Sequence, residues 1–228
     1  MSEIVPVNTE TLIKHSLASQ LRAEIISGAL QPGVRIVEGT WARRFGVAQG
    51  SIREAINILA QEGFVTKDSG RSARVVNLSE EDILHLYAIR GALEGLAART
   101  AAFSRADVSQ LQLMLDAMCA AAKNGRYEVV LDRTLEFHLE LCRLSGNPFL
   151  IAHAKRVLLP FFAFVRIRVM ADQREAEEWR RNIGSHQKII DLILEGDGDV
   201  AEFYVRRAMT RYATTASDAW DKSTDEAG

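Results

Sequence analysis

A short run of polar side chains near residue 50 has the types and spacing that suit contacts with nucleic acid. From Gly50 to Ala60 the apolar residues recur at i, i+3, i+4 and i+7, so they would line one face of a helix. The opposite face carries donors and acceptors suited to base edges and phosphates. These side chains are Gln49, Ser51, Arg53 and Asn57. The pattern predicts a helix with one buried face and one face that reads DNA.

The segment before this helix completes a helix-turn-helix pattern. Thr40 can cap a short helix at its start. The buried side of that helix would contain Trp41, Ala42 and Phe45. Gly46 then permits the positive φ of a tight turn between two helices.

A hairpin with basic residues follows the polar-faced helix. Two short runs rich in β-branched residues flank a Ser-Gly loop at 68–72, and this order of elements is typical of a winged helix-turn-helix. Arg71 and Arg74 of the wing are expected to reach the DNA backbone or minor groove, and Gly70 is expected among the DNA-binding residues. Arg43 and Arg44 lie beside the helix-to-helix turn, where we expect phosphate contacts rather than base contacts. A solvated helix face is the alternative for the polar side chains, but the turn and the hairpin favour DNA binding.

The size and charge of the chain allow two modest domains. The chain has 228 residues, of which 47% are hydrophobic and 25% charged, as in ordinary soluble proteins. Its net charge of −2 argues against a generic polyanion binder. Residues 1–78 contain nine Lys and Arg against seven Asp and Glu, so a slight basic excess lies with the predicted DNA-reading face.

Neither a membrane span nor an export signal is expected. The longest apolar run, Val157 to Val165, is interrupted by Pro160 and is too short to cross a bilayer. The first ten residues lack the basic segment and apolar run of a signal peptide. Cys119 and Cys142 do not make a disulfide framework. We therefore expect a cytoplasmic protein with no membrane partner.

The rest of the chain shows only helical patterns. Ser79 followed by Asp82 has the form of a capping box, and it marks our boundary between domains 1–78 and 79–228. Short connections rich in Gly, Ser and Asn separate the helical stretches that follow, which predicts an antiparallel bundle. The helices are expected over 80–103, 107–123, 126–145, 147–170, 173–195 and 198–219. The fold class is therefore mainly α, an N-terminal winged helix-turn-helix plus a C-terminal antiparallel all-helical bundle of about six helices.

With these elements assigned, the chain resembles the GntR family of transcription regulators. The winged part carries LRAEIISGALQPG, RIVE and FGVAQGSIREAINILAQEGFV. The helical part is similar to the FCD-type ligand-binding domain of the FadR subfamily through LYAIRGALEGLAARTAA, EFHLELCRLSGNPFL and SHQKIIDLILEGD. The resemblance implies a homodimeric transcription factor, most often a repressor, that binds a double-stranded DNA operator. It also implies a small-molecule effector, a carboxylate or similar metabolite, and no catalytic residues.

The predicted DNA-reading face departs from the family pattern. Where the family usually has Ser-Arg-Thr-Pro-Val-Arg, residues 48–53 read Ala-Gln-Gly-Ser-Ile-Arg. Arg53 is retained, but Gln49 stands at the family's base-reading arginine and Gly50 follows it. Arginine suits guanine and glutamine suits adenine. Gly39 also occupies a position where many relatives carry arginine, so we expect an operator unlike those of familiar relatives.

The ligand domain departs further. Many FadR-type members bind a divalent metal through an Asp four residues before a His, together with two later histidines. His138 and His186 match two of these ligands, but Thr134 and Ala208 occupy the other two positions. A neutral threonine is a poor substitute for a carboxylate. We therefore expect no cofactor, and a His/Cys site that adds Cys142 to the histidines is the remaining metal alternative.

The resemblance places an effector pocket in the helical domain. Its expected residues are Arg90, Thr134, His138, Arg166 and His186. Arg90 has two interpretations: a salt bridge to Glu94 at i+4, or a guanidinium that binds a carboxylate where relatives use a metal. A hydrogen-bonded core histidine is the alternative for His138.

Two other functions stay open at this point. One is a metal-binding helical bundle, either an enzyme or a metal-dependent sensor, fused to a DNA-binding module. The sequence shows no two carboxylates paired with the histidines and no activated nucleophile. The other is an architectural protein that binds DNA without sequence preference, which the pI of about 6.2 disfavours. Metal content and DNA sequence preference of the purified protein would separate these functions.

Overall fold

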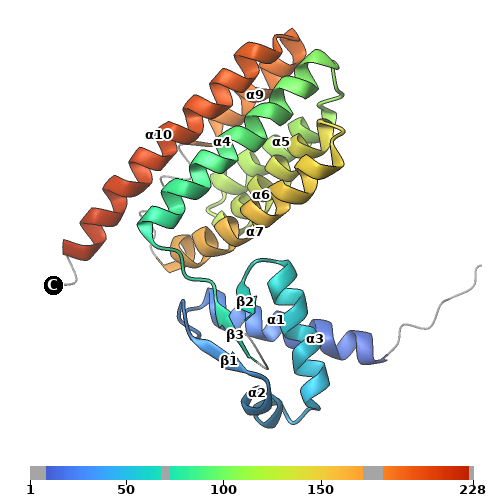
Figure 1. Cartoon of the computed structure of the whole chain (residues 1–228), viewed down its shortest axis with the longest axis vertical. Coiled ribbons are helices and arrows are strands. Elements are labelled where there is room, and N and C mark those ends of the chain that lie inside the picture. The colour runs from blue at the N-terminus through green and yellow to red at the C-terminus, as the bar shows by residue number, and fades with distance from the viewer. Residues whose placement is uncertain (1–8, 68–71, 172–181, 226–228) are drawn as a thin grey trace, which may run out of the picture. The chain divides into compact units, whose positions relative to one another are not determined.

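The structure divides the chain into two compact units, Met1–Asn77 and Leu78–Gly228. It is a computed structural model that describes residues 9–67, 72–171 and 182–225. Figure 1 shows the elements of each unit, which are taken in turn below.

Helices and a three-stranded antiparallel sheet form the first unit. In chain order its described elements are α1 (Thr9–Ile26), β1 (Arg35–Val37), α2 (Glu38–Phe45), α3 (Gln49–Gln61), β2 (Val65–Lys67) and β3 (Ser72–Val75). β3 is central, because the strand order is β1-β3-β2. Ile36 pairs with Ala73 on one side, and Thr66 pairs with Arg74 on the other. The winged helix-turn-helix is thus confirmed, and the short extended piece before α2 is the third strand of its sheet.

The turn between α2 and α3 forms as the sequence predicts. Gly46 ends α2 in the left-handed conformation at φ 66°, which favours glycine. Trp41 and Ala42 are buried on α2. The cap is different from the prediction: α2 begins at Glu38, so Thr40 lies inside its first turn. β1 runs directly into the helix, and the cap residue Val37 has no side-chain hydrogen bond to offer.

The second unit is a helical bundle. Its described helices are α4 (Glu80–Phe103), α5 (Ser109–Lys123), α6 (Tyr127–Leu144), α7 (Pro148–Ala171), α9 (Gly184–Glu195) and α10 (Gly198–Asp225). α4 packs against α6, α7, α9 and α10, so it is the central helix of the bundle. Figure 1 shows α10 lying along α4. The mainly helical fold is confirmed; the first part of the stretch expected at 173–195 lies outside the described residues.

Local sequence features explain how α4 starts and how closely it packs. Ser79 Oγ accepts a hydrogen bond from the Asp82 amide at 3.1 Å, and Asp82 Oδ2 accepts one from the Ser79 amide at 2.9 Å. This is the predicted capping box. A Cβ on Gly95 would lie 3.0 Å from Cγ of Arg206, and one on Gly198 would lie 2.7 Å from the Arg99 carbonyl. Glycine at these positions therefore lets α10 approach α4 closely.

α7 carries the long apolar segment of the chain. Among the described helices it alone is long and apolar enough to cross a membrane by length and composition, over Pro148–Met170. It packs against α4 and α6 in the bundle, and Phe161 and Phe162 are buried there as core residues. This packing buries 44% of the apolar stretch.

Candidate functional site

The polar face of α3 presents the predicted DNA-reading side chains. Gln49, Gly50 and Arg53 are exposed, and Ser51 and Asn57 are half-buried. The opposite face is fixed in the core by Ile52, Ala55, Ile56 and Leu59, which are at most 3% exposed. Burial of one face therefore orients the other toward solvent, as the residue pattern predicts.

Arg53 is held in one orientation by a buried carboxylate. Its Nε lies 3.0 Å from Glu38 Oε1, and its Nη2 lies 2.9 Å from Glu38 Oε2. The Glu38 side chain is 7% exposed, whereas that of Arg53 is 49% exposed. Such a two-point contact fixes the plane of the guanidinium. Its exposed edge is thereby preorganised for a contact outside the protein.

Arg43 and Arg44, the predicted phosphate contacts, have different surroundings in the structure. Arg43 is exposed at the end of α2. Arg44 stacks on Trp41, with its guanidinium carbon 4.4 Å from the ring centroid, and pairs with Glu24 at 2.7 Å. Gly70 and Arg71 lie outside the described residues, so their predicted role in the wing is not addressed by the structure.

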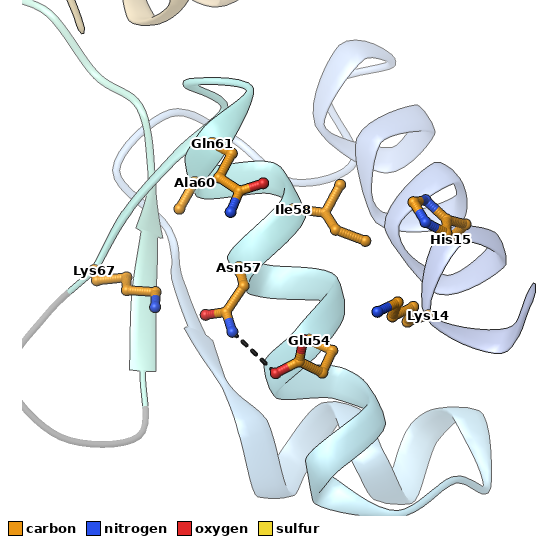
Figure 2. Close-up of a pocket in the computed structure, with 8 residues that line it drawn as sticks. All are labelled: Lys14, His15, Glu54, Asn57, Ile58, Ala60, Gln61 and Lys67. Carbon is orange, nitrogen blue, oxygen red and sulfur yellow. Dashed lines mark hydrogen bonds between the residues drawn. The ribbon is translucent and has the colours of Figure 1, made fainter. Parts of the chain in front are cut away.

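An open hollow of about 670 Å³ lies beside the middle of α3. Figure 2 shows Lys14 and His15 of α1 on one side of α3 and Lys67 of β2 on the other. Between them Asn57 donates a hydrogen bond from Nδ2 to Glu54 Oε1 at 3.1 Å. The buried Oδ1 of Asn57 has no hydrogen-bond partner among the described residues. Lys14 and Lys67, which line this hollow, were not singled out from the sequence, because they belong to no local pattern.

In the second unit, three predicted effector residues and one further residue, Glu94, meet in the bundle core. Arg90 Nε lies 2.7 Å from Glu94 Oε1, and both side chains are at most 2% exposed. Glu94 Oε2 approaches His138 Nδ1 to 2.6 Å, although the contact is poorly aligned for a hydrogen bond. His138 Nε2 lies 3.4 Å from His186 Nε2. We call Arg90, Glu94, His138 and His186 the buried charged cluster.

Burial and the contacts within the buried charged cluster determine the protonation states of Glu94 and His186. Burial alone would raise the pKa of Glu94, but the charges of Arg90 and His138 and the hydrogen bond from Arg90 lower that pKa to about 2. Burial, together with the charge of His138, lowers the pKa of His186 to about 3. His186 Nδ1 lies 3.0 Å from the Ile183 carbonyl, so a proton on Nδ1 leaves Nε2 as an acceptor toward His138. Glu94 is therefore ionised and His186 neutral near neutral pH.

Two of the predicted effector residues have other partners. Thr134 is buried and donates a hydrogen bond to the Val130 carbonyl at 2.7 Å, next to Met118 of α5. Arg166 pairs with Asp132 and Glu128 of α6. The structure thus brings Arg90, His138 and His186 together, whereas the recorded partners of Thr134 and Arg166 lie outside this group.

The described residues do not fit a divalent metal. His138 and His186 offer two ring nitrogens, and Ala208 at the third family position has no ligand atom. Burial raises the pKa of the Cys142 thiol, which disfavours the thiolate that a metal would need. Within the described ranges, no group of three or more His, Cys, Asp or Glu side chains is arranged to hold a metal ion. Glu94 contacts the Nδ1 side of His138, away from the nitrogen that faces His186.

Glu94 is the residue that sequence reasoning underestimated. From the sequence, Glu94 was expected only as the partner of Arg90 in an ordinary i,i+4 salt bridge. In the structure it contacts both Arg90 of its own helix and His138 of α6. Its position four residues after Arg90 was visible in the sequence. Its contact with His138 was not, because it depends on how α4 and α6 pack.

Fold and side chains together define a class: a winged helix-turn-helix DNA-binding protein with an all-helical second domain. The sequence pattern of "Bacterial regulatory proteins, gntR family" matches residues 13–75, and that of the "FCD domain" matches residues 85–211. The chain belongs to the GntR family and carries an FCD domain. It is therefore a DNA-binding transcription regulator rather than an enzyme.

Curated relatives cover most of the chain. It is 27% identical over 212 residues to a probable D-xylose utilization operon transcriptional repressor of Paenarthrobacter nicotinovorans, covering 90% of each protein. It is 25% identical over 187 residues to a gluconate operon transcriptional repressor of Bacillus licheniformis, covering 81% of this chain and 76% of that protein. The solved structure of E. coli McbR/YncC shares the fold with a TM-score of 0.69 at 17% identity, over 91% of this chain and 98% of that one.

Proposed function

We propose that this regulator is a cytoplasmic homodimeric repressor whose operator binding is controlled by a small carboxylate bound at Arg90. Residues 1–78 would bind the operator, and residues 79–228 would bind the effector and form the dimer. The observation that carries the proposal is the buried charged cluster. Burying an ion pair in a helical core costs desolvation free energy, so a functional role is a reason for its presence.

The chemistry of Arg90 supports a carboxylate effector. Its guanidinium carbon lies 4.4 Å from the Phe161 ring centroid and 5.1 Å from that of Phe162, so aromatic faces fix its plane. A guanidinium held in this way binds a carboxylate with good geometry. Glu94 already provides such a carboxylate from within the chain. An effector carboxylate would compete with Glu94 for Arg90, and His138 would lose or change its own contact with Glu94.

The names of the relatives narrow the effector class. Two similar proteins are described as repressors of D-xylose utilization and gluconate operons. We extend this to a sugar acid as effector here. A sugar acid offers one carboxylate for Arg90 and several hydroxyls for neighbouring donors and acceptors.

An exposed apolar stripe on α4 supports the homodimer. Ile89, Leu96 and Phe103 recur every seven residues and are 46%, 44% and 57% exposed. Val200 and Phe203 of α10 are exposed as well, and α10 packs along α4. Exposed apolar side chains that recur along one helix favour an interaction site there. A second copy would bury it, and twofold symmetry would set two α3 helices in successive major grooves.

Isothermal titration of the full-length protein with sugar acids, gluconate first, tests the effector site. We expect binding by the wild type and at least tenfold weaker binding by Arg90→Met. Arg143→Met is the matched control, because Arg143 pairs with Glu140 on the bundle surface and its side chain is 61% exposed. Circular dichroism establishes that each variant is folded. Equal affinity of Arg90→Met and wild type would place the effector elsewhere, and stoichiometric metal in the purified protein would favour the metal-binding alternative.

A further inference from the structure

The first turn of α2 touches the first turn of α3 at the predicted DNA-reading face. A Cβ added to Gly39 would lie 3.2 Å from Gln49 Nε2 and 3.9 Å from Gln49 Cδ. A separation of 3.2 Å is tighter than an ordinary Cβ contact, so one of the two groups would have to shift by a few tenths of an ångström. The Gln49 amide therefore occupies space that a side chain on residue 39 would need.

The neighbouring residue of α2 acts on the same face. Arg53 donates three hydrogen bonds to Glu38, from Nε to both carboxylate oxygens and from Nη2 to Oε2. Gln49 and Arg53 are one helical turn apart on α3, so they lie on the same face. Two successive residues of α2 thus contact the two exposed side chains with the strongest capacity to read bases.

We propose that Gly39 is a specificity-determining residue that acts through Gln49: the absence of a side chain at residue 39 sets where the Gln49 amide lies and hence which base it reads. The proposal rests on the proposed DNA-reading role of α3. Gly39 itself would touch no base. It is a positioning residue, in the same sense that Glu38 positions Arg53.

The chemistry of glutamine makes its position matter. Glutamine recognises adenine through two hydrogen bonds, donating to N7 and accepting from the N6 amino group. Both bonds require the amide plane to meet the base edge, and hydrogen bonds weaken steeply when they are misaligned. A methyl group at residue 39 would force the Gln49 amide to shift by a few tenths of an ångström or to change rotamer. Either change degrades the two-bond contact while leaving the helix intact.

Substitution by alanine is compatible with the local backbone. Gly39 lies within α2 and does not have a positive φ. Alanine is also the better helix former. An effect of Gly39→Ala on DNA recognition would therefore not arise from unfolding of α2, which circular dichroism and thermal melting of the full chain would verify.

The test is a double-mutant cycle read out by selection of binding sites from a pool of random DNA duplexes. The full-length wild type, Gly39→Ala, Gln49→Ala and the double variant are compared. We expect Gly39→Ala to alter base preference at the same operator step as Gln49→Ala, with discrimination there reduced about fivefold or more. In the Gln49→Ala background, Gly39→Ala should change nothing further. Gly184→Ala in α9 is the control, because an added Cβ there meets nothing within 4 Å.

The outcomes separate the two levels of the proposal. If Gln49→Ala shifts base preference and Gly39→Ala does not, the coupling through Gln49 is wrong while α3 remains the reader. If Gly39→Ala acts equally with and without Gln49, residue 39 works by another route and the proposal fails. If Gln49→Ala and Arg53→Ala both select the wild-type site with wild-type affinity, the DNA-reading role of α3 itself is wrong.

Discussion

Removing one partner of the buried Arg90–Glu94 pair is expected to destabilise the helical unit strongly, whereas removing both should cost far less. Each side chain is at most 2% exposed, so a remaining partner could not be solvated by water. Breaking a buried pair typically costs about 3–5 kcal/mol, while replacing the whole pair by apolar residues is often nearly neutral. The variants are Arg90→Met, Glu94→Leu and the two combined.

The pKa of Glu94 gives the stability that depends on its ionisation, a quantity related to the cost of removing Arg90 but distinct from it. The pKa of Glu94 is about 2 in the folded state against 4.5 for an ordinary Glu. At about 1.4 kcal/mol per pKa unit, this difference corresponds to about 3 kcal/mol of stability near neutral pH. For a unit of this size, 3–5 kcal/mol lowers the melting temperature by roughly 6–20 °C.

Thermal and urea unfolding of the full chain, followed by circular dichroism, measures the cycle. Arg143→Met serves as the exposed control, with an expected cost of about 0–1 kcal/mol. Single variants that cost no more than this control would refute the reasoning, because the pair would then behave as a solvated one. A double variant whose cost equals the sum of the singles would refute it as well, since no coupling would exist.

Three further variants test His186, the close approach of α10 to α4, and the exposed stripe of α4. The folded pKa of His186 is about 3, below its unfolded value of 6.5, so its contribution to stability is complete above pH 6.5 and is lost as pH drops toward 3. The free energy of unfolding in urea, plotted against pH, should therefore have a smaller slope for His186→Gln than for the wild type, and equal slopes would contradict this. Gly198→Ala should cost about 1–3 kcal/mol in thermal unfolding, because the new Cβ would lie 2.7 Å from a backbone carbonyl; an unchanged melting temperature would be the contrary result. Leu96→Asp should dissociate the proposed homodimer in analytical ultracentrifugation, since it places a charge in the exposed stripe of α4. A dimer that stays intact would mean that the interface lies elsewhere.

Much of the fold was predictable because local rules decide it. The apolar spacing of Ile52, Ile56 and Leu59 fixes the buried face of α3, and Gly46 fixes the turn before it. The capping box at Ser79 marks the start of α4. The start of α2 was not predictable in the same way. Pairing of β1 with β3 extends the chain up to Val37, and this contact with a distant strand overrides the local signal of Thr40.

The sites were predictable only in part, since they depend on how helices pack. Motif matching found Arg90, His138 and His186, which the structure brings together. It could not find that Glu94 contacts His138, nor that Thr134 turns toward α5. In the DNA-binding unit, the sequence alone marks Gly39 and Gln49 as two separate departures from the family pattern. Only the structure shows that a Cβ on residue 39 would lie 3.2 Å from the Gln49 amide nitrogen.

We propose that a carboxylate bound at Arg90 controls DNA binding, and fluorescence anisotropy of a labelled operator measures this control. The operator would be the duplex selected by the wild-type protein, titrated with and without gluconate or the sugar acid that binds most tightly. We predict that the acid weakens DNA binding of the wild type by about five- to 150-fold, the usual range of allosteric coupling. The combined Arg90→Met and Glu94→Leu variant should bind the operator but not respond. An unchanged wild-type affinity at saturating acid, or an equal response of the variant, would contradict the claim.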